Sequence, residues 1–200
     1  MFKRNQIQKT IIVAGVTLSS CVAFAQQTET TTATVTVQNA FTLTEVAGLS
    51  FGTITASAIS GATSSIVLLA DGTAGTSPDS GDGIRVLAPG TPASYTIAAA
   101  APFTDLKASV NVDSISLSNA AAPAANPDFT VGNFTISNGT AIASLTSGAL
   151  AFTTGTALTT DVNGALALSI GGTLTLPDTA EDTLLVDGAY TGQFTLTVQY

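Results

Sequence analysis

Side chains that act as acids, bases, nucleophiles or metal ligands are scarce in this chain of 200 residues, which has no His and one Cys. Most nucleophile–base pairs and transition-metal sites require His or Cys. Lys107 and Ser109 could form a Ser–Lys pair, but alternate residues on a strand beside a lone Lys are more often a solvated surface. We therefore expect no catalytic residues, no cofactor site and no enzymatic activity.

Carboxylates offer a second kind of chemistry, because Ca²⁺ prefers oxygen ligands. They gather in two stretches, the first with Asp79 and Asp82 and the second with Asp178, Glu181, Asp182 and Asp187. Neither stretch has the full alternating ligand pattern of a known calcium loop, and acidic residues in turns are usually solvated. A glycosidase pair would have to face across a cleft, of which the sequence gives no sign. We expect no metal site, although calcium binding stays an open alternative.

Aromatic residues are the remaining candidates for ligand binding. A sugar-binding platform usually presents exposed Trp or Tyr, and the chain has no Trp and three Tyr residues, Tyr95, Tyr190 and Tyr200. Most of the Phe residues lie within apolar runs or at their ends, which is typical of core packing. The aromatic residues therefore predict a hydrophobic core.

The N-terminus has the pattern of a signal peptide. Met1–Thr10 carries three basic residues, Ile11–Val22 is apolar, and the triplet Ala23–Ala25 gives a cleavage point before Gln26. The apolar run is too short to cross a bilayer as a stable helix. We therefore expect residues 1–25 to be removed during export, with no integral membrane segment left.

The single Cys, Cys21, lies inside this leader. Leu18–Cys21 also matches a lipobox, which would leave a lipid-modified Cys21 as the mature N-terminus, but the apolar run before Leu18 would be unusually short. Removal of residues 1–25 leaves 175 residues without Cys, so we expect no disulfide. A chain of that length can bury one sizeable core by packing alone.

Loss of the leader would also change the charge. Only Arg85 and Lys107 would remain against 13 acidic residues, a formal net charge of −11. Nucleic acids and anionic membrane surfaces attract proteins through positive patches, which this composition does not provide. We therefore expect no nucleic-acid partner and no attachment to an anionic membrane surface.

The elements that would position any site are strands, because apolar and polar residues alternate along the whole chain. At the C-terminus one face of a half-buried strand carries Tyr190, Gly192, Phe194, Leu196, Val198 and Tyr200. A second alternation covers residues 166–176, with a bulge or bend at Gly171 and Gly172. A third covers residues 32–44, as one long strand or two collinear strands.

Shorter strand candidates lie in the middle of the chain: residues 49–54, 65–70, 84–87, 94–98, 107–117 and 129–137. Apolar parity shifts within the last two, which predicts a bulge in each. Four dipeptides between the runs tolerate positive φ and suit tight turns: Asp71-Gly72, Asn138-Gly139, Asn163-Gly164 and Asp187-Gly188. Residues 72–83 and 119–127 are expected as longer loops. This spacing predicts an all-β sandwich.

Residues 40–44, 49–54, 168–176 and 188–200 carry a likeness to a known family. In these segments the chain resembles a bacterial family of uncharacterised exported proteins described as pilin-like. Its ends are also similar to those of major pilins in alternative chaperone-usher systems, which have an alternating N-terminal extension and a C-terminal strand with a Gly-x-Tyr-x-Gly start.

This resemblance implies an immunoglobulin-like antiparallel β-sandwich over residues 39–200, with an open groove that a strand of another molecule completes. The donor would be the N-terminal extension, residues 26–38, through the side chains of Ala33, Val35 and Val37. The C-terminal strand would border the groove and be held by a periplasmic chaperone.

The expected function is therefore that of a structural subunit of an extracellular fimbria or surface filament, which polymerises by strand exchange after export through the periplasm with a chaperone and an usher. The alternative is a self-contained secreted or surface-attached domain that binds a partner protein or a glycan. In that alternative residues 31–44 complete the chain's own sheet.

Overall fold

The computed structural model describes residues 27–35, 40–76, 83–123, 126–148, 158–179 and 183–200. The chain divides into two units, Met1–Val37 and Gln38–Tyr200, which are described separately. In the first unit, residues 27–35 form no strand and are exposed. The second unit, called the domain below, is built from strands. Within the described ranges there is no helix of the length and apolarity needed to cross a membrane.

Several expectations concern residues outside the described ranges, and they stay predictions. These residues are the leader with Cys21, the donor residue Val37, and the carboxylates Asp79, Asp82, Glu181 and Asp182.

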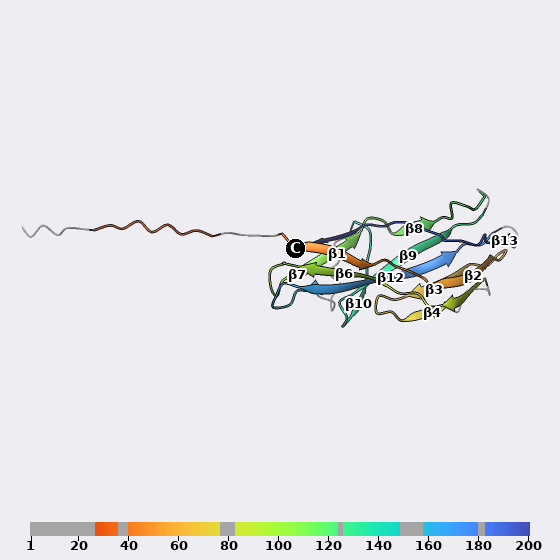
Figure 1. Cartoon of the computed structure of the whole chain (residues 1–200), viewed down its shortest axis with the longest axis horizontal. Coiled ribbons are helices and arrows are strands. Elements are labelled where there is room, and N and C mark those ends of the chain that lie inside the picture. The colour runs from red at the N-terminus through yellow and green to blue at the C-terminus, as the bar shows by residue number, and fades with distance from the viewer. Residues whose placement is uncertain (1–26, 36–39, 77–82, 124–125, 149–157, 180–182) are drawn as a thin grey trace, which may run out of the picture. The chain divides into compact units, whose positions relative to one another are not determined.

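Fourteen strands form the described part of the domain (Figure 1). In chain order they are β1 Thr42–Ala47, β2 Thr53–Ala58, β3 Ser64–Leu68, β4 Ala74–Thr76, β5 Ile84–Ala88, β6 Ala93–Ala98, β7 Asp105–Val110, β8 Ser114–Leu117, β9 Phe129–Ser137, β10 Ile142–Ser144, β11 Leu158–Thr159, β12 Leu166–Leu176, β13 Thr183–Leu184 and β14 Leu196–Gln199. Every pairing between these strands is antiparallel, so the predicted all-β, antiparallel fold is confirmed.

The larger layer is organised around β12. One edge of β12 pairs first with β6 and then with β3, while the other edge pairs with β9. β1 extends the layer beyond β6, β4 extends it beyond β3, and β8 and β10 extend it beyond β9. β12 is the longest strand of the described domain, is hydrogen-bonded on both edges, and buries Leu168, Ile170, Leu174 and Leu176 in the core.

Gly171 marks the point at which β12 changes its partner from β6 to β3. A Cβ atom there would lie 2.1 Å from the carbonyl oxygen of Leu68, so no larger residue fits without moving the backbone. The register between β12 and β9 shifts between Gly171 and Thr173, opposite Asn133, whose φ is 48°. The extra residue of this single register shift lies on β9, so the bulge predicted within residues 129–137 is confirmed; on the β12 side the irregularity falls at Gly171 and Gly172, where a bulge or bend was predicted.

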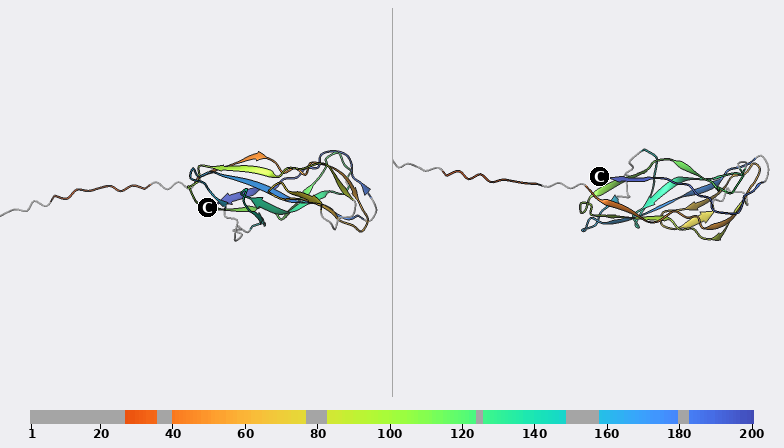
Figure 2. Two further views of the ribbon diagram at one scale, coloured as in Figure 1. Left: turned by 90° about the horizontal axis from the view of Figure 1, so that it is seen from below. Right: turned by 45° about the horizontal axis from the view of Figure 1, so that its top comes forward.

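The smaller layer is in two pieces, β11-β7-β14 and β13-β2-β5, which are separate sheets in the described part of the chain. Both pieces lie over the larger layer, as two views of the domain show (Figure 2). The buried cluster joins Leu106 and Val110 of β7 to Ile97 of β6 and Ile170 of β12. The predicted sandwich is therefore present, with a break in one of its layers.

Large aliphatic and aromatic side chains fill the space between the layers. Those with almost no exposed surface include Ile97, Leu106, Val110, Val131, Phe134, Leu168, Ile170 and Leu176. Burial of each such side chain contributes about 1.5–3 kcal/mol to the free energy of unfolding. Packing therefore supplies the stability of a chain whose single Cys cannot form an internal disulfide.

The four predicted turn dipeptides all place Gly in the left-handed region. The φ angles are 86° at Gly72, 84° at Gly139, 72° at Gly164 and 141° at Gly188. The first two close the hairpins β3–β4 and β9–β10. Glycine reaches these angles without a steric cost, which is why these dipeptides could be identified from the sequence.

Several predicted strands were drawn too long or misplaced: residues 49–54 overlap β2 only at Thr53 and Ile54, and the strand predicted over residues 190–200 is regular only over Leu196–Gln199. Residues 107–117 do not bulge within one strand: they split into β7 and β8, because the chain passes here from the smaller layer to the larger. Among the described residues of the range 32–44, only Thr42–Leu43–Thr44 lies in a strand, and residues 27–35 are in none. The predicted loop over residues 72–83 also contains a short strand, β4.

Candidate functional site

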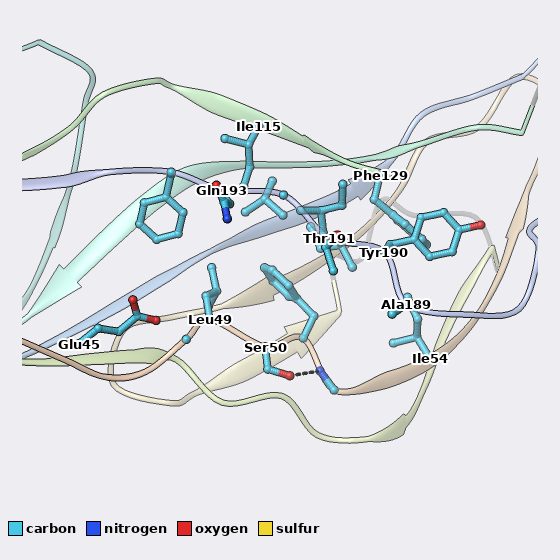
Figure 3. Close-up of a pocket in the computed structure, with 18 of the residues that line it drawn as sticks. Glu45, Leu49, Ser50, Ile54, Ile115, Phe129, Ala189, Tyr190, Thr191 and Gln193 are labelled. Atoms are coloured by element: carbon cyan, nitrogen blue, oxygen red, sulfur yellow. Dashed lines mark hydrogen bonds between the residues drawn. The ribbon is translucent and has the colours of Figure 1, made fainter. Parts of the chain in front are cut away.

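A groove lies at the break in the smaller layer. It has a volume of about 930 Å³ and runs between residues 45–54 on one side and the C-terminal segment, residues 188–195, on the other. Figure 3 shows the two walls facing each other across side chains of the larger layer. The break is therefore an elongated opening that reaches down to the opposite layer of the sandwich.

The floor of the groove is apolar and belongs to the larger layer. Its side chains are Ile115 and Leu117 from β8, Phe129 and Val131 from β9, and Leu174 from β12. Phe129, Val131 and Leu174 are buried, whereas Ile115 and Leu117 are half-buried. Apolar surface that is continuous with the core is thus accessible from the groove.

The first wall is the stretch in which the chain leaves one layer for the other. β1 pairs with β6 in the larger layer, and β2 pairs with β5 in the smaller one. Between them, Ser50 exchanges backbone hydrogen bonds of 2.9 and 2.7 Å with Thr91, which does not line the groove. Leu49, Phe51 and Ile54 of this wall are half-buried and pack against the core cluster.

The second wall, the C-terminal segment, is held in place by its aromatic residues. The ring of Tyr190 meets that of Phe129 edge-on, with the centroids 5.1 Å apart. The ring of Phe194 lies tilted against that of Phe134, with the centroids 4.8 Å apart. Each of these contacts connects the wall to β9 in the opposite layer, so the wall has a fixed position above the floor.

Backbone hydrogen bonds fix the outer edge of the C-terminal segment. Thr191 exchanges two of them with Ser118, of 3.0 and 3.1 Å. Thr195 accepts one from the N–H of Asn111 and donates one to its side-chain oxygen. Gly192, between them, allows a close approach to β8, because a Cβ atom there would lie 2.4 Å from the carbonyl oxygen of Ser116.

The inner edges of both walls are unpaired. Backbone groups of an extended chain alternate in direction, so Gly192 and Phe194 direct theirs away from β7 and β8 and into the groove. On the first wall, Ser50 directs its backbone groups toward Thr91, so the adjacent Phe51 directs its own backbone groups into the groove. Within the part of the chain that the structure describes, the N–H groups of Gly192, Phe194 and Phe51 make no hydrogen bond. An unpaired edge of this kind is a template for a further strand.

One end of the groove is polar. Glu45 of β1 lies opposite Tyr95 of β6, and both side chains line the groove. Burial raises the pKa of the Tyr95 hydroxyl, and the neighbouring Glu45 carboxylate raises it further. The hydroxyl therefore stays protonated at neutral pH and can donate a hydrogen bond to a bound segment.

The six C-terminal residues predicted to form an assembly strand fall into two groups. Three of them line the groove: Tyr190, Gly192 and Phe194. The other three lie beyond it: Leu196 and Val198 in β14, and Tyr200 at the end of the chain. Regular strand structure covers only Leu196–Gln199, but the apolar face predicted for the whole segment is half-buried throughout except at Gly192.

The predicted donor residues belong to the first unit. Ala33 and Val35 are exposed, and Val35 exposes 87% of its surface. An apolar side chain exposed to that degree is available for a contact with another molecule.

The remaining candidates are Lys107, Ser109 and the carboxylates. Lys107 and Ser109 share one face of β7, where Lys107 is half-buried and Ser109 exposes 7% of its surface, so the solvated surface expected there is not found at Ser109. Among the described residues, no three His, Cys, Asp or Glu side chains are grouped as metal ligands would be.

Sequence reasoning did not identify the first wall or the floor as a site. Leu49, Phe51, Ile115 and Leu117 were expected only as strand residues. The parity shift within residues 107–117 was the available signal, because it marks the place where the chain changes layers and brings Ile115 under the groove.

Comparison with known proteins gives one match. A family described as DUF4402, a domain of unknown function, matches residues 41–200, a range that contains both walls and the floor of the groove. No curated protein and no solved structure matches the chain.

Proposed function

The chain belongs to the DUF4402 family, and we propose that it is a structural subunit of an extracellular fimbria or surface filament. The groove of each domain receives the N-terminal extension of a neighbouring copy, so that consecutive subunits share a sheet. The observation that carries this proposal is the groove of about 930 Å³ with an unpaired backbone edge on each wall.

The extension has the pattern that such a groove requires. Ala33, Val35 and Val37 alternate with Thr residues, so in a strand all three point to the same face. That face would lie on the apolar floor, while the Thr side chains face solvent. Burial of each Val contributes about 1.5–3 kcal/mol. Pairing with both walls supplies backbone hydrogen bonds in addition, as in other cases of strand addition.

The directions of the two walls restrict how a strand can enter. The strands β1, β6, β12, β9 and β8 are antiparallel in succession, and Ser118, just after β8, is antiparallel to Thr191. The C-terminal segment therefore runs opposite to β1. An inserted strand must be parallel to one wall and antiparallel to the other.

This restriction separates the chain's own extension from that of a neighbour. To enter its own groove, the extension would turn back before Phe41 and run antiparallel to β1, hence parallel to the C-terminal segment. A neighbour's extension can take the opposite direction and pair antiparallel with the C-terminal segment. Antiparallel pairing is slightly more stable per residue than parallel pairing. When the inserted strand runs antiparallel to the C-terminal segment, the donor's domain lies beyond the Ile54 end of the groove.

Export and assembly factors belong to the same proposal. An open groove with an apolar floor and two free edges exposes the subunit to aggregation. A periplasmic chaperone would cover the groove until an usher replaces the chaperone with the extension of the next subunit. Together they would remove this hazard. The leader pattern of residues 1–25 supports passage through the periplasm.

Cysteine cross-linking tests where the extension binds and in which molecule. In a chain with Cys21→Ser, Val35→Cys and either Ile115→Cys or Leu117→Cys, no other cysteine is present. We expect oxidation to give a ladder of covalent oligomers on a non-reducing gel, because Val35 of one copy lies on the floor of the next.

The matched control replaces Val35→Cys with Thr34→Cys. Thr34 faces away from the floor in the proposed strand, so this chain should give no ladder. Disulfides formed only within monomers would show that each domain is completed by its own extension. A chain that forms no disulfide at either floor position would contradict filling of the groove altogether.

A further inference from the structure

Two exposed apolar side chains, Phe103 and Val162, form a patch at one end of the domain, called here the apolar tip. Phe103 exposes 71% of its surface and Val162 exposes 63%. Phe103 also has a φ of 52°, a left-handed conformation that is uncommon for a large side chain. An exposed aromatic residue on a strained backbone contributes nothing to the core, so its position calls for another explanation.

The loops that carry the apolar tip are held together. The N–H of Phe103 donates to the carbonyl oxygen of Asp161, and the Thr160 hydroxyl donates to the carbonyl oxygen of Ala101. The Asp161 carboxylate accepts hydrogen bonds of 2.8 Å from the N–H groups of Ala165 and Asn163, which lower the pKa of that carboxyl. The tip is therefore a fixed surface of the domain.

The apolar tip is linked through Tyr200 to Phe41, near the start of the described part of the domain. The hydroxyl of Tyr200 accepts a hydrogen bond of 3.1 Å from the N–H of Ala101, two residues before Phe103. The ring of Tyr200 also meets that of Phe41 edge-on, with the centroids 5.4 Å apart. The first residues of the domain and the apolar tip thus share the end that contains the C-terminus (Figure 1).

The opposite end of the domain carries another exposed apolar residue. Leu184 of β13 exposes 78% of its surface and lies opposite Ser57 of β2, three residues beyond the groove residue Ile54. Three residues of a strand span about 10 Å. Leu184 is therefore close to the end of the groove at which, under the proposed strand direction, the donor's domain would stand.

The chain between Val37 and Phe41 is short, which limits how far the donor's domain can stand from the Leu184 end of the acceptor. Four residue steps separate Val37, the last donor side chain, from Phe41, and they span at most about 14 Å. A copy whose Val37 occupies the Ile54 end of a groove holds its own Phe41 within about 14 Å of that end. Its apolar tip lies at the same end of its domain as Phe41 and so on the side nearest the Leu184 end of the acceptor.

We propose that Phe103 and Val162 of each copy pack against the Leu184 end of the next copy, in a head-to-tail contact beside the inserted strand. This inference rests on the proposed function. The contact joins two different surfaces of the same chain, and a heterologous contact that does not close on itself gives an open filament. It sets the angle between consecutive domains, which a strand joined by a few residues of chain would leave variable.

Cross-linking between the two ends tests this contact. In a chain with Cys21→Ser, Phe103→Cys and Leu184→Cys, a short thiol-reactive cross-linker should convert assembled polymers into a covalent ladder that survives denaturation. The two cysteines of one chain are at opposite ends of the domain and cannot be joined to each other. The matched control pairs Phe103→Cys with Leu87→Cys, an apolar residue of β5 that exposes 59% of its surface, and should give no ladder.

Failure of this inference differs from failure of the proposed function. Polymers that require the extension but give no 103–184 ladder, or give the same ladder with the Leu87→Cys control, would overturn the tip contact alone. A chain that forms no polymers would overturn the proposed function, and the tip contact with it.

Discussion

Deletion of residues 27–38 is expected to abolish polymer formation and to leave the domain folded. The deleted residues that the structure describes, 27–35, are exposed and take part in no strand. Among the described residues the buried core lies between Ala58 and Leu185, so residues 27–35 contribute no core side chain. Size-exclusion chromatography should show monomers only, while the thermal midpoint of the domain followed by circular dichroism stays at the value of the undeleted monomer.

A synthetic peptide with the sequence of residues 27–39 provides the control for this deletion. Added in excess to the undeleted chain, it should occupy the grooves and shorten the polymers, whereas a scrambled peptide of the same composition should not. Polymers that form at the normal level without residues 27–38 would exclude the extension as the donor.

The substitution Val35→Asp is expected to have the second largest effect, while its neighbour Thr34→Asp should be nearly neutral. Adjacent residues of a strand point to opposite faces, so Asp at position 35 would be pressed onto the apolar floor and Asp at position 34 would face solvent. An uncompensated buried charge costs about 3–5 kcal/mol. We therefore expect the affinity of a peptide with residues 27–39 for a domain that begins at residue 40 to fall by at least about 100-fold.

Calorimetric titration of the two peptide variants measures this difference directly. Both variants add the same single negative charge, so a difference between them reports the face of the strand and not the charge itself. Equal weakening by Val35→Asp and Thr34→Asp would mean that the extension binds by some mode other than an alternating strand in the groove.

The sequence was sufficient to predict the fold class and the turns. Strict alternation over residues 166–176 predicted the central strand, and its two glycines predicted the irregularity at which β12 changes partner. Asn-Gly and Asp-Gly dipeptides predicted the positive φ angles at Gly72 and Gly139. These features are local, because they depend on the conformational preferences of one or two residues or on a two-residue period.

The groove was not predictable in the same way. Its floor and walls come from segments that are distant in sequence, such as Leu49, Ile115 and Phe194, and they meet only because two strands cross from one layer to the other. The crossing within residues 107–117 shifts the parity of the apolar residues, but the shift does not show which segments come to face each other. The break in the smaller layer and the two free edges therefore leave no signal in the pattern of a single chain.

The extension has a clear pattern in the sequence, but its described residues form no strand in the structure. Residues 32–44 alternate in the sequence except at Asn39 and Ala40, which predicted one long strand or two collinear strands, yet β1 begins only at Thr42. Alternation reports that a segment has an apolar face, but not which molecule covers that face. The exposed Val35 is the residue in which this difference is seen.

Amide hydrogen exchange tests the occupation of the groove most directly. In a domain that begins at residue 40, the amides of Phe51, Gly192 and Phe194 lie on free edges and should exchange rapidly. Addition of the peptide with residues 27–39 should slow exchange at wall amides that face the groove, and leave that of Thr191, already bonded to Ser118, little changed. Unchanged rates on both walls at a saturating peptide concentration would contradict strand insertion.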